Sequence, residues 1–356
     1  MSSDRSRMNS AFSSTFLKFF SPILAIISAF LVSAILILLA RKNPLVAYEA
    51  LFQESLANRY GFGNTLTKTI PLLLTSLGVF IGLKAGQFNI GGEGQIYMGG
   101  LGSALVGLYA QGLPGIIHLP LALLGGFLFG AMWGLIPGYL KAVRGVNEVI
   151  TTLLLNYIAQ NLISYLTQGP MMEPGAPSPF SPKLPASAQL PTILPGTQAH
   201  AGILVAVVTA LILWLVLIKS PLGYQIEVVG QNPTAASYAG MSVRRTIMLV
   251  MAVSGGLAGL AGSSEVMGLK YRLFQDFSGG YGFDAIAIAL LSRGSIIAVV
   301  ITSLFFGALR SGANVMQRSA GVPSTVVYVI QGLTVLFIAI SLTVESKRQR
   351  KTNQFQ

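Results

Sequence analysis

Long apolar runs with very few charged residues recur along the whole chain, and they constrain its fold more than any other feature. An α-helix needs about 20 such residues to cross the hydrocarbon core of a bilayer. Charged residues make up 10% of the chain and hydrophobic residues 53%, whereas soluble domains carry roughly 25% charged residues. The chain lacks the charge to cover a water-facing surface, so we expect an all-α polytopic membrane protein.

Ten runs are apolar enough to predict about ten transmembrane helices, with broken or re-entrant segments among them. They lie at residues 19–40, 66–83, 95–111, 116–140, 149–166, 201–218, 246–268, 283–292, 296–316 and 323–343. The run at 283–292 is too short to cross alone, so a half-helix or re-entrant piece is expected there. The predicted organisation is a tail at 1–18, a transmembrane domain at 19–343 with a connector at 219–245, and a tail at 344–356.

Lysine and arginine set the predicted orientation, because they are enriched in the cytoplasmic loops of membrane proteins. With ten passes and a cytoplasmic N-terminus, fourteen basic residues fall in segments predicted to be inside and eight in segments predicted to be outside. Lys68, Lys270 and Arg272 are among the outside residues. We therefore expect both termini in the cytoplasm. The net charge of +12 is interpreted as loops that face anionic lipid, not as a nucleic-acid site.

Two pairs of short segments resemble each other, which suggests an internal repeat. The pairs are residues 89–95 with 277–283, and residues 128–134 with 305–311. In the predicted topology each pair lies on spans that run in opposite directions. This pattern predicts inverted halves near 66–166 and 246–343, an arrangement typical of transporters. The alternative is chance similarity between glycine-rich membrane segments.

A polar, glycine-rich stretch at residues 84–97 separates two apolar runs. Its glycines allow a broken helix, and irregular backbone survives at membrane depth only where it is buried in protein or lines a watery cavity. The candidate pathway residues in this stretch are Gln87, Asn89, Glu93 and Gln95. The alternatives are a site at the cytoplasmic mouth facing partner proteins, and a solvated turn with Glu93 at a helix start.

Further polar groups lie in or beside later runs, where ionisable side chains are costly and usually face the protein interior. Asn156 and Asp284 complete the set of candidate pathway residues. Similar positions are held by Asn147, Glu148, Gln160 and Arg293. Asn147 has the alternative role of capping a helix.

Glycines recur at every fourth position in two of the later runs. They are Gly126, Gly130, Gly134 and Gly138 in one run, and Gly255 and Gly259 in another. Four-residue spacing places small residues on one helix face and lets membrane helices approach closely. We interpret both faces as packing surfaces.

The connector at 219–245 carries start and stop signals for a short helix. Asn232 is a good N-cap, Pro233 suits the first helical position, and Gly240 suits a left-handed stop. A small rigid helix between two spans is what a separate motor subunit needs to push on. An ordinary connector is the alternative.

The residue patterns of an enzyme are missing from the sequence. There is no cysteine, and the two histidines, His118 and His200, are far apart, so neither a thiolate nor a histidine metal site is expected. The glycine-rich phosphate-binding loop that ends in Gly-Lys-Ser/Thr is absent too. We therefore expect no catalytic residue, no metal and no cofactor.

Three segments together resemble the permease subunits of ATP-binding-cassette importers for simple sugars, branched-chain amino acids and nucleosides. They are residues 86–95, 229–241 and 282–291, and the resemblance extends over roughly 45–343. Asn-Ile-Gly at 89–91 followed by Glu-Gly-Gln at 93–95 is most similar to the nucleoside branch of the family. That branch is linked to solute-binding lipoproteins of the type called basic membrane proteins. The chain departs from the family after Leu291, where Ser-Arg-Gly-Ser replaces paired glycines and a proline, so no role is inferred for that turn.

This resemblance implies a path for a small neutral polar solute, preferably a nucleoside, that works by alternating access driven by a separate ATPase. It implies three protein partners in the bacterial cytoplasmic membrane: a cytoplasmic ATP-binding subunit, a second permease that is identical or homologous, and an extracytoplasmic solute-binding protein or lipoprotein. Membrane lipid surrounds the spans. The residues implied to dock on the ATPase are Gly230, Asn232, Pro233, Ala235, Ala236, Tyr238 and Gly240.

Other functions remain open at this point. Sugars and branched-chain amino acids are alternative solutes within the same family. A stand-alone secondary transporter or channel is suggested by the inverted repeat, with Glu93, Glu148 and Asp284 as candidates for ion coupling. A membrane scaffold without a pathway is the third possibility.

Overall fold

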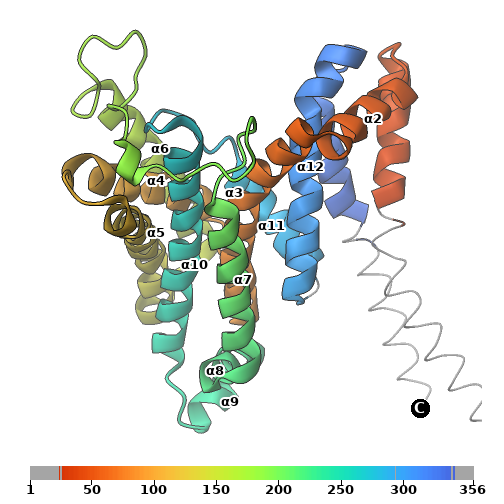
Figure 1. The fold of residues 1–356 in the computed structure, drawn as a ribbon. Helices are drawn as coiled ribbons and strands as arrows, with labels where there is room; N and C mark the ends of the chain where they lie inside the picture. Colours follow the sequence, from red (N-terminus) through yellow and green to blue (C-terminus); the bar gives the residue numbers. More distant parts are fainter. Residues whose placement is uncertain (1–23, 25, 293, 338–339, 341–356) are drawn as a thin grey trace, which may run out of the picture. The chain divides into compact units, whose positions relative to one another are not determined.

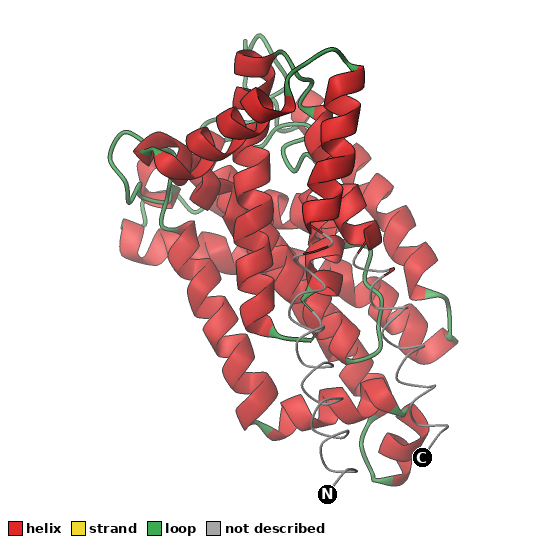
Figure 2. Ribbon diagram, turned by 90° about the vertical axis from the view of Figure 1, so that its right-hand side faces the viewer, coloured by secondary structure: helices red, strands yellow, loops and turns green. Residues whose placement is uncertain are grey.

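The computed structural model describes residues 24, 26–292, 294–337 and 340. The predicted tails and Arg293 lie outside the described residues. The chain packs as two units, one from residues 1–58 with 309–356 and one from residues 59–308. Within the described ranges, helices are joined by loops, with two isolated β-bridges and no strand (Figure 2). The predicted all-α class is therefore confirmed.

The smaller unit contains a helix at Ile26–Leu39, α2 at Pro44–Phe52, η1 at Gln53–Ala57, the second half of α12 and a helix at Thr325–Phe337. The first of these helices packs on α2, because the Tyr48 hydroxyl donates to the Phe30 carbonyl at 2.7 Å and the two rings meet edge to face. The Asn43 side chain caps α2 by accepting from the Leu45 N–H at 2.9 Å.

The larger unit holds the remaining elements. They are α3 (Arg59–Lys84), α4 (Gly92–Tyr109), α5 (Gly115–Arg144), α6 (Glu148–Gln168), η2 (Ala186–Ala188), α7 (Gly202–Lys219), α8 (Pro221–Gln231), α9 (Pro233–Tyr238), α10 (Val243–Glu265), η3 (Val266–Lys270), α11 (Tyr281–Leu291) and the first half of α12 (Ile296–Ala320).

Six helices of the described chain are long and apolar enough to cross a membrane: α3, α5, α6, α7, α10 with η3, and α12. Each of the ten predicted runs contains a helix. The helix in the run at 283–292 is α11, which has 11 residues and cannot cross a bilayer by itself. The re-entrant path and the inverted repeat stay predictions.

The core of the larger unit is a crossing of α5 and α10 in which glycine backbones touch. A Cβ on Gly130 would overlap the carbonyl oxygen of Gly255, and a Cβ on Gly255 would overlap that of Gly130. Gly259 meets the backbone of Gly126 in the same way, and Gly134 meets that of Met251. The predicted glycine faces are therefore confirmed as one packing interface.

The two ends of the larger unit differ in character (Figure 1). One end carries the loop between α6 and α7, which is irregular, as its prolines predict. Backbone hydrogen bonds of 2.9 Å from Ser181, Leu184 and Leu190 tie this loop to residues 267–273. An ion pair between Glu173 and Arg272 adds to them. The opposite end carries α8 and α9, which follow α7.

Replacing Gly130 with Leu should destabilise the larger unit, because a side chain at this position must push α5 away from α10. Overpacking of this kind costs about 1–3 kcal/mol or more. The measurement is thermal unfolding in detergent. Gly332→Leu is the matched control, since Gly332 lies in a helix of the smaller unit with no atom within 4 Å of its Cβ position. A melting temperature for Gly130→Leu equal to that of the control would contradict the interface.

Candidate functional site

The predicted helix break is present between α3 and α4. α3 ends at Lys84, α4 begins at Gly92, and residues 85–91 are not helical. Asn89, which is 1% exposed, organises the break. Its Oδ1 accepts from the Gly91 N–H at 2.8 Å, and its Nδ2 donates to Gln95 Oε1 at 2.9 Å and to Ser254 Oγ at 2.8 Å. Asn89 thereby joins the break to Gln95 of α4 and to Ser254 of α10.

Asn156 of α6 satisfies the backbone on the other side of the break. Its Oδ1 accepts from the Gly94 N–H at 2.8 Å, and its Nδ2 donates to the Ile90 carbonyl at 2.9 Å. Buried backbone N–H and C=O groups need such partners, because an unpaired polar group that is shielded from water is costly. The amide side chains therefore stabilise the irregular backbone.

Glu93 connects the start of α4 to the start of α11. Its carboxylate accepts from the Gly280 N–H at 3.1 Å and from the Gly282 N–H at 2.8 Å. A carboxylate at a helix N-terminus is favoured by the helix dipole and by charge-assisted hydrogen bonds. The backbones also touch, since a Cβ on Gly282 would overlap the backbone of Glu93. The N-termini of two helices therefore meet at one buried carboxylate.

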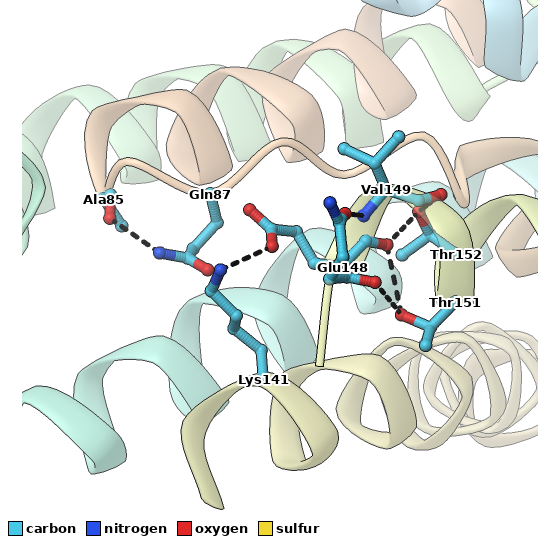
Figure 3. A network of polar contacts seen from close by, with 8 residues as sticks. Ala85, Gln87, Lys141, Glu148, Val149, Thr151 and Thr152 are labelled. Atoms are coloured by element: carbon cyan, nitrogen blue, oxygen red, sulfur yellow. Dashed lines mark hydrogen bonds and ion pairs between the residues drawn. The ribbon is translucent and has the colours of Figure 1, made fainter. Parts of the chain in front are cut away.

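The remaining polar side chain of the break, Gln87, lies nearer its α3 end, close to polar residues of α5 and α6 (Figure 3). Gln87 Nε2 donates to the Ala85 carbonyl at 3.3 Å, and its buried Oε1 has no hydrogen-bond partner among the described residues. Close to it, Lys141 at the end of α5 pairs with Glu148 at 2.8 Å. Asn147 caps α6 by accepting from the Val149 N–H at 2.9 Å, which confirms its capping role.

The structure thus brings five of the six candidate pathway residues into one junction. Gln87, Asn89, Glu93, Gln95 and Asn156 are each less than 9% exposed and hydrogen-bond to protein groups. Asp284 is half-buried on the first turn of α11. Contact of any of the six with a solute stays a prediction.

The short helix predicted in the connector is confirmed as α9. Asn232 Oδ1 accepts from the Ala235 N–H at 3.0 Å, and Gly240 follows the helix with φ of +79°. Ala236 is buried, whereas Tyr238 is 88% exposed and projects from the end of the bundle. The sequence analysis missed α8, although Ser220 followed by Pro221 is the same kind of start signal as Asn232 followed by Pro233.

Gly230 joins this segment to the helix break. A Cβ on Gly230 would overlap the Lys84 carbonyl at the end of α3, and a Cβ on Gly86 would lie 3.1 Å from the Gly230 carbonyl. Lys84 also pairs with Glu227 of α8 at 3.6 Å. Because Lys84 directly precedes the break, α8 rests against the backbone that leads to Asn89 and Glu93.

Lys68 lies within the predicted run at 66–83 and was counted among the basic residues of the outside segments. In the structure α3 begins at Arg59, so Lys68 lies nine residues inside that helix. Its Nζ lies 5.6 Å from the centre of the Tyr281 ring. For Lys68, the signal available in the sequence was a lysine between apolar stretches.

The contact of Gln160 with Asp276, 2.6 Å between Nε2 and Oδ1, was not predicted.

Comparison with known proteins gives a consistent result. The family model described as "Branched-chain amino acid transport system / permease component" matches residues 61–339. The glucose ABC transporter permease protein TsgB13 of Haloferax volcanii is 38% identical over 90% of this chain and 87% of its own length. The guanosine ABC transporter permease protein NupP of Bacillus subtilis is 37% identical over 91% and 93%. The nucleoside ABC transporter permease protein NupB of Lactococcus lactis is 34% identical over 91% of each.

Replacing Glu93 with Gln should loosen the junction, because an amide offers one acceptor oxygen and turns its NH₂ toward the second backbone N–H. Hydrogen bonds to charged groups contribute about 1.5–3 kcal/mol, so a loss of this size is expected in the free energy of unfolding. Thermal or denaturant unfolding in detergent measures it. Glu49→Gln on α2 is the control, because Glu49 is exposed. Equal stability of the two variants would show that Glu93 does not hold α11.

Proposed function

Because this chain belongs to the branched-chain amino acid transport system / permease component family, we propose that it forms the path for nucleosides in an ATP-binding-cassette importer. As a permease subunit it is a multi-pass membrane protein and is not itself catalytic. Family membership implies a separate ATP-binding subunit and a solute-binding protein as partners.

The observation that carries the proposal is the contact between α8 and the helix break. The exposed α9 offers a rigid surface to an ATPase, and Gly230 leaves no space between α8 and the Lys84 carbonyl. A push on α9 is therefore transmitted to the backbone that leads to Asn89 and Glu93. A cavity of about 260 Å³ lies beside Lys84 and Glu227 and is also lined by Trp214 of α7.

The basic residues at the end of the larger unit that carries α8 and α9 support a cytoplasmic position for these two helices. The helix ends on their side carry Lys84, Lys141, Arg144, Lys219, Arg244 and Arg245. Lysine and arginine near span ends favour the cytoplasmic side. In this orientation the ATP-binding subunit meets α9, and the solute-binding protein approaches the loop between α6 and α7. The permease pair is completed by an identical or homologous copy.

The choice of solute rests on the relatives and on the break itself. Two of the three relatives named above carry guanosine or nucleoside in their names, and the third carries glucose at a similar identity. The residues at 89–95 resemble the nucleoside branch. Nucleosides are therefore proposed ahead of sugars, and branched-chain amino acids rank third. A stand-alone secondary transporter is disfavoured, because members of this family act with an ATPase.

Uptake measurements test the proposed function directly. The chain is reconstituted into liposomes with the ATPase, the second permease and the solute-binding protein encoded nearest to it. We expect ATP-dependent uptake of guanosine and uridine, and little uptake of glucose, ribose or leucine. Equal flux by the chain alone without ATP would reject the importer. ATP-dependent uptake of glucose in place of guanosine would reject the nucleoside.

Replacing Gly240 with Val should uncouple ATP hydrolysis from uptake. A β-branched residue resists positive φ, so the end of α9 must change its path. The measurement is the ratio of solute transported to ATP hydrolysed, which should fall while insertion into the membrane is unchanged.

Gly112→Val is the matched control for this variant. Gly112 has φ of +82° and, like Gly240, no atom within 4 Å of its Cβ position, but it lies in the loop between α4 and α5. Unchanged coupling in Gly240→Val would contradict the role proposed for α9.

A further inference from the structure

A charged side chain lies deep inside α3. Lys68 is nine residues from the start of the helix at Arg59 and sixteen from its end at Lys84. At ~1.5 Å per residue it therefore lies about 14 Å from one end and about 24 Å from the other. Its ammonium lies over the ring of Tyr281, the first residue of α11, and the side chain remains partly exposed.

A polar pair lies at similar depth beside α6, formed by Gln160 of that helix and Asp276. Gln160 is twelve residues after Glu148 and eight before the end of the helix at Gln168, or about 18 Å and about 12 Å from the two ends. Its amide donates to the carboxylate of Asp276, and both groups are accessible. One helical turn before Gln160, Tyr157 is 58% exposed.

The segment between η3 and α11 connects the two places. Phe277 packs edge to face on Tyr97 of α4 and so fixes the position of the adjacent Asp276. Tyr281 follows Asp276 by five residues, a length of chain that spans at most about 18 Å. The intervening Ser278 is 1% exposed, and its hydroxyl has no hydrogen-bond partner among the described residues. Asp276 therefore lies on a short segment that packs beside α4 and leads to Tyr281.

Burial of these groups against lipid would be costly. Ionisable side chains within a span almost always face the protein interior or a water-filled cavity. The residues of the helix break are buried, whereas Gln160 and Asp276 bind each other at an accessible position. The accessible polar groups are therefore better placed to contact a solute than the buried ones.

We propose that Gln160 and Asp276, together with Tyr157, form a solute-binding subsite of the path. This inference rests on the proposed function and names the residues that recognise the solute. The Asp276 carboxylate accepts hydrogen bonds from paired hydroxyl groups, as on a ribose ring. Gln160 offers both a donor and an acceptor to the edge of a base, and the exposed Tyr157 ring offers a stacking face.

The subsite is matched to a neutral solute. The Gln160 amide and the Asp276 carboxylate bind hydroxyl and amide groups, so no charge on the ligand is required. The bond between Gln160 and Asp276 is exchanged for bonds to the solute on entry and forms again on release. The buried junction at Glu93 then has a different task, which is to hold α4 and α11 beside the subsite.

Thiol labelling tests the subsite, because the chain has no cysteine of its own. Gln160→Cys and Tyr157→Cys are made separately in the reconstituted complex and treated with a membrane-impermeant, charged thiosulfonate reagent. Both should be labelled, because such a reagent reaches only thiols in contact with water. Ile158→Cys is the matched control, since Ile158 is 54% exposed on the same helix but points away from Gln160. It should stay unlabelled in lipid.

Guanosine should protect the two subsite cysteines. At ten times its dissociation constant the solute leaves about one site in eleven free, so labelling slows about tenfold. Protection by glucose or leucine in place of guanosine would support the subsite and overturn the nucleoside assignment. Absence of labelling in every nucleotide state, in variants that still transport, would overturn the subsite. A disulfide between two permeases through Gln160→Cys would also overturn it, because it would place Gln160 in a subunit contact.

Discussion

The close approach of glycine backbones at α10 is the interaction on which the rest of the larger unit depends. Gly255 and Gly259 meet α5 without any intervening side chain, and Gly262 meets the backbone of α4 at Ile96. A Cβ on Gly78 of α3 would lie 2.5 Å from the carbonyl oxygen of Ser254. Because three helices contact α10 backbone to backbone, their depth and register are fixed. That register brings Ser254 to Asn89 and so determines where the helix break lies.

A buried segment of irregular backbone is stable only if its N–H and C=O groups have partners. Here Asn156 and Asn89 bind the backbone between α3 and α4, and Glu93 binds the first N–H groups of α11. The amides and the carboxylate that looked like pathway residues therefore have structural partners in this conformation. The same arrangement makes the region responsive, because α8 rests on its α3 end through Gly230. One polar junction thus links the connector to α4, α6 and α11.

Much of the fold could be predicted because it follows from local rules. The ten apolar runs all contain helices, Asn147 and Asn232 cap the helices that follow them, and the glycine spacing identified the interface of α5 with α10. The start of α3 was misplaced because Gly, Asn and Thr precede its apolar part. Those residues are helical here because they pack against other parts of the protein, and tertiary contacts override weak local propensity.

The sequence by itself determined the class of the protein, its helices, the break after Lys84 and the short helix that starts at Pro233. These features depend on transfer of side chains into lipid and on contacts within a few residues. Only the tertiary structure decided which polar side chains are buried and hydrogen-bonded to other parts of the protein. Asn89 binds the Ser254 hydroxyl and Asn156 binds the backbone of Gly94, both far away in sequence, whereas Gln160 meets Asp276 at an accessible position. Hydrogen-bond satisfaction is a property of three-dimensional neighbours, so a list of residue types could not separate the two groups.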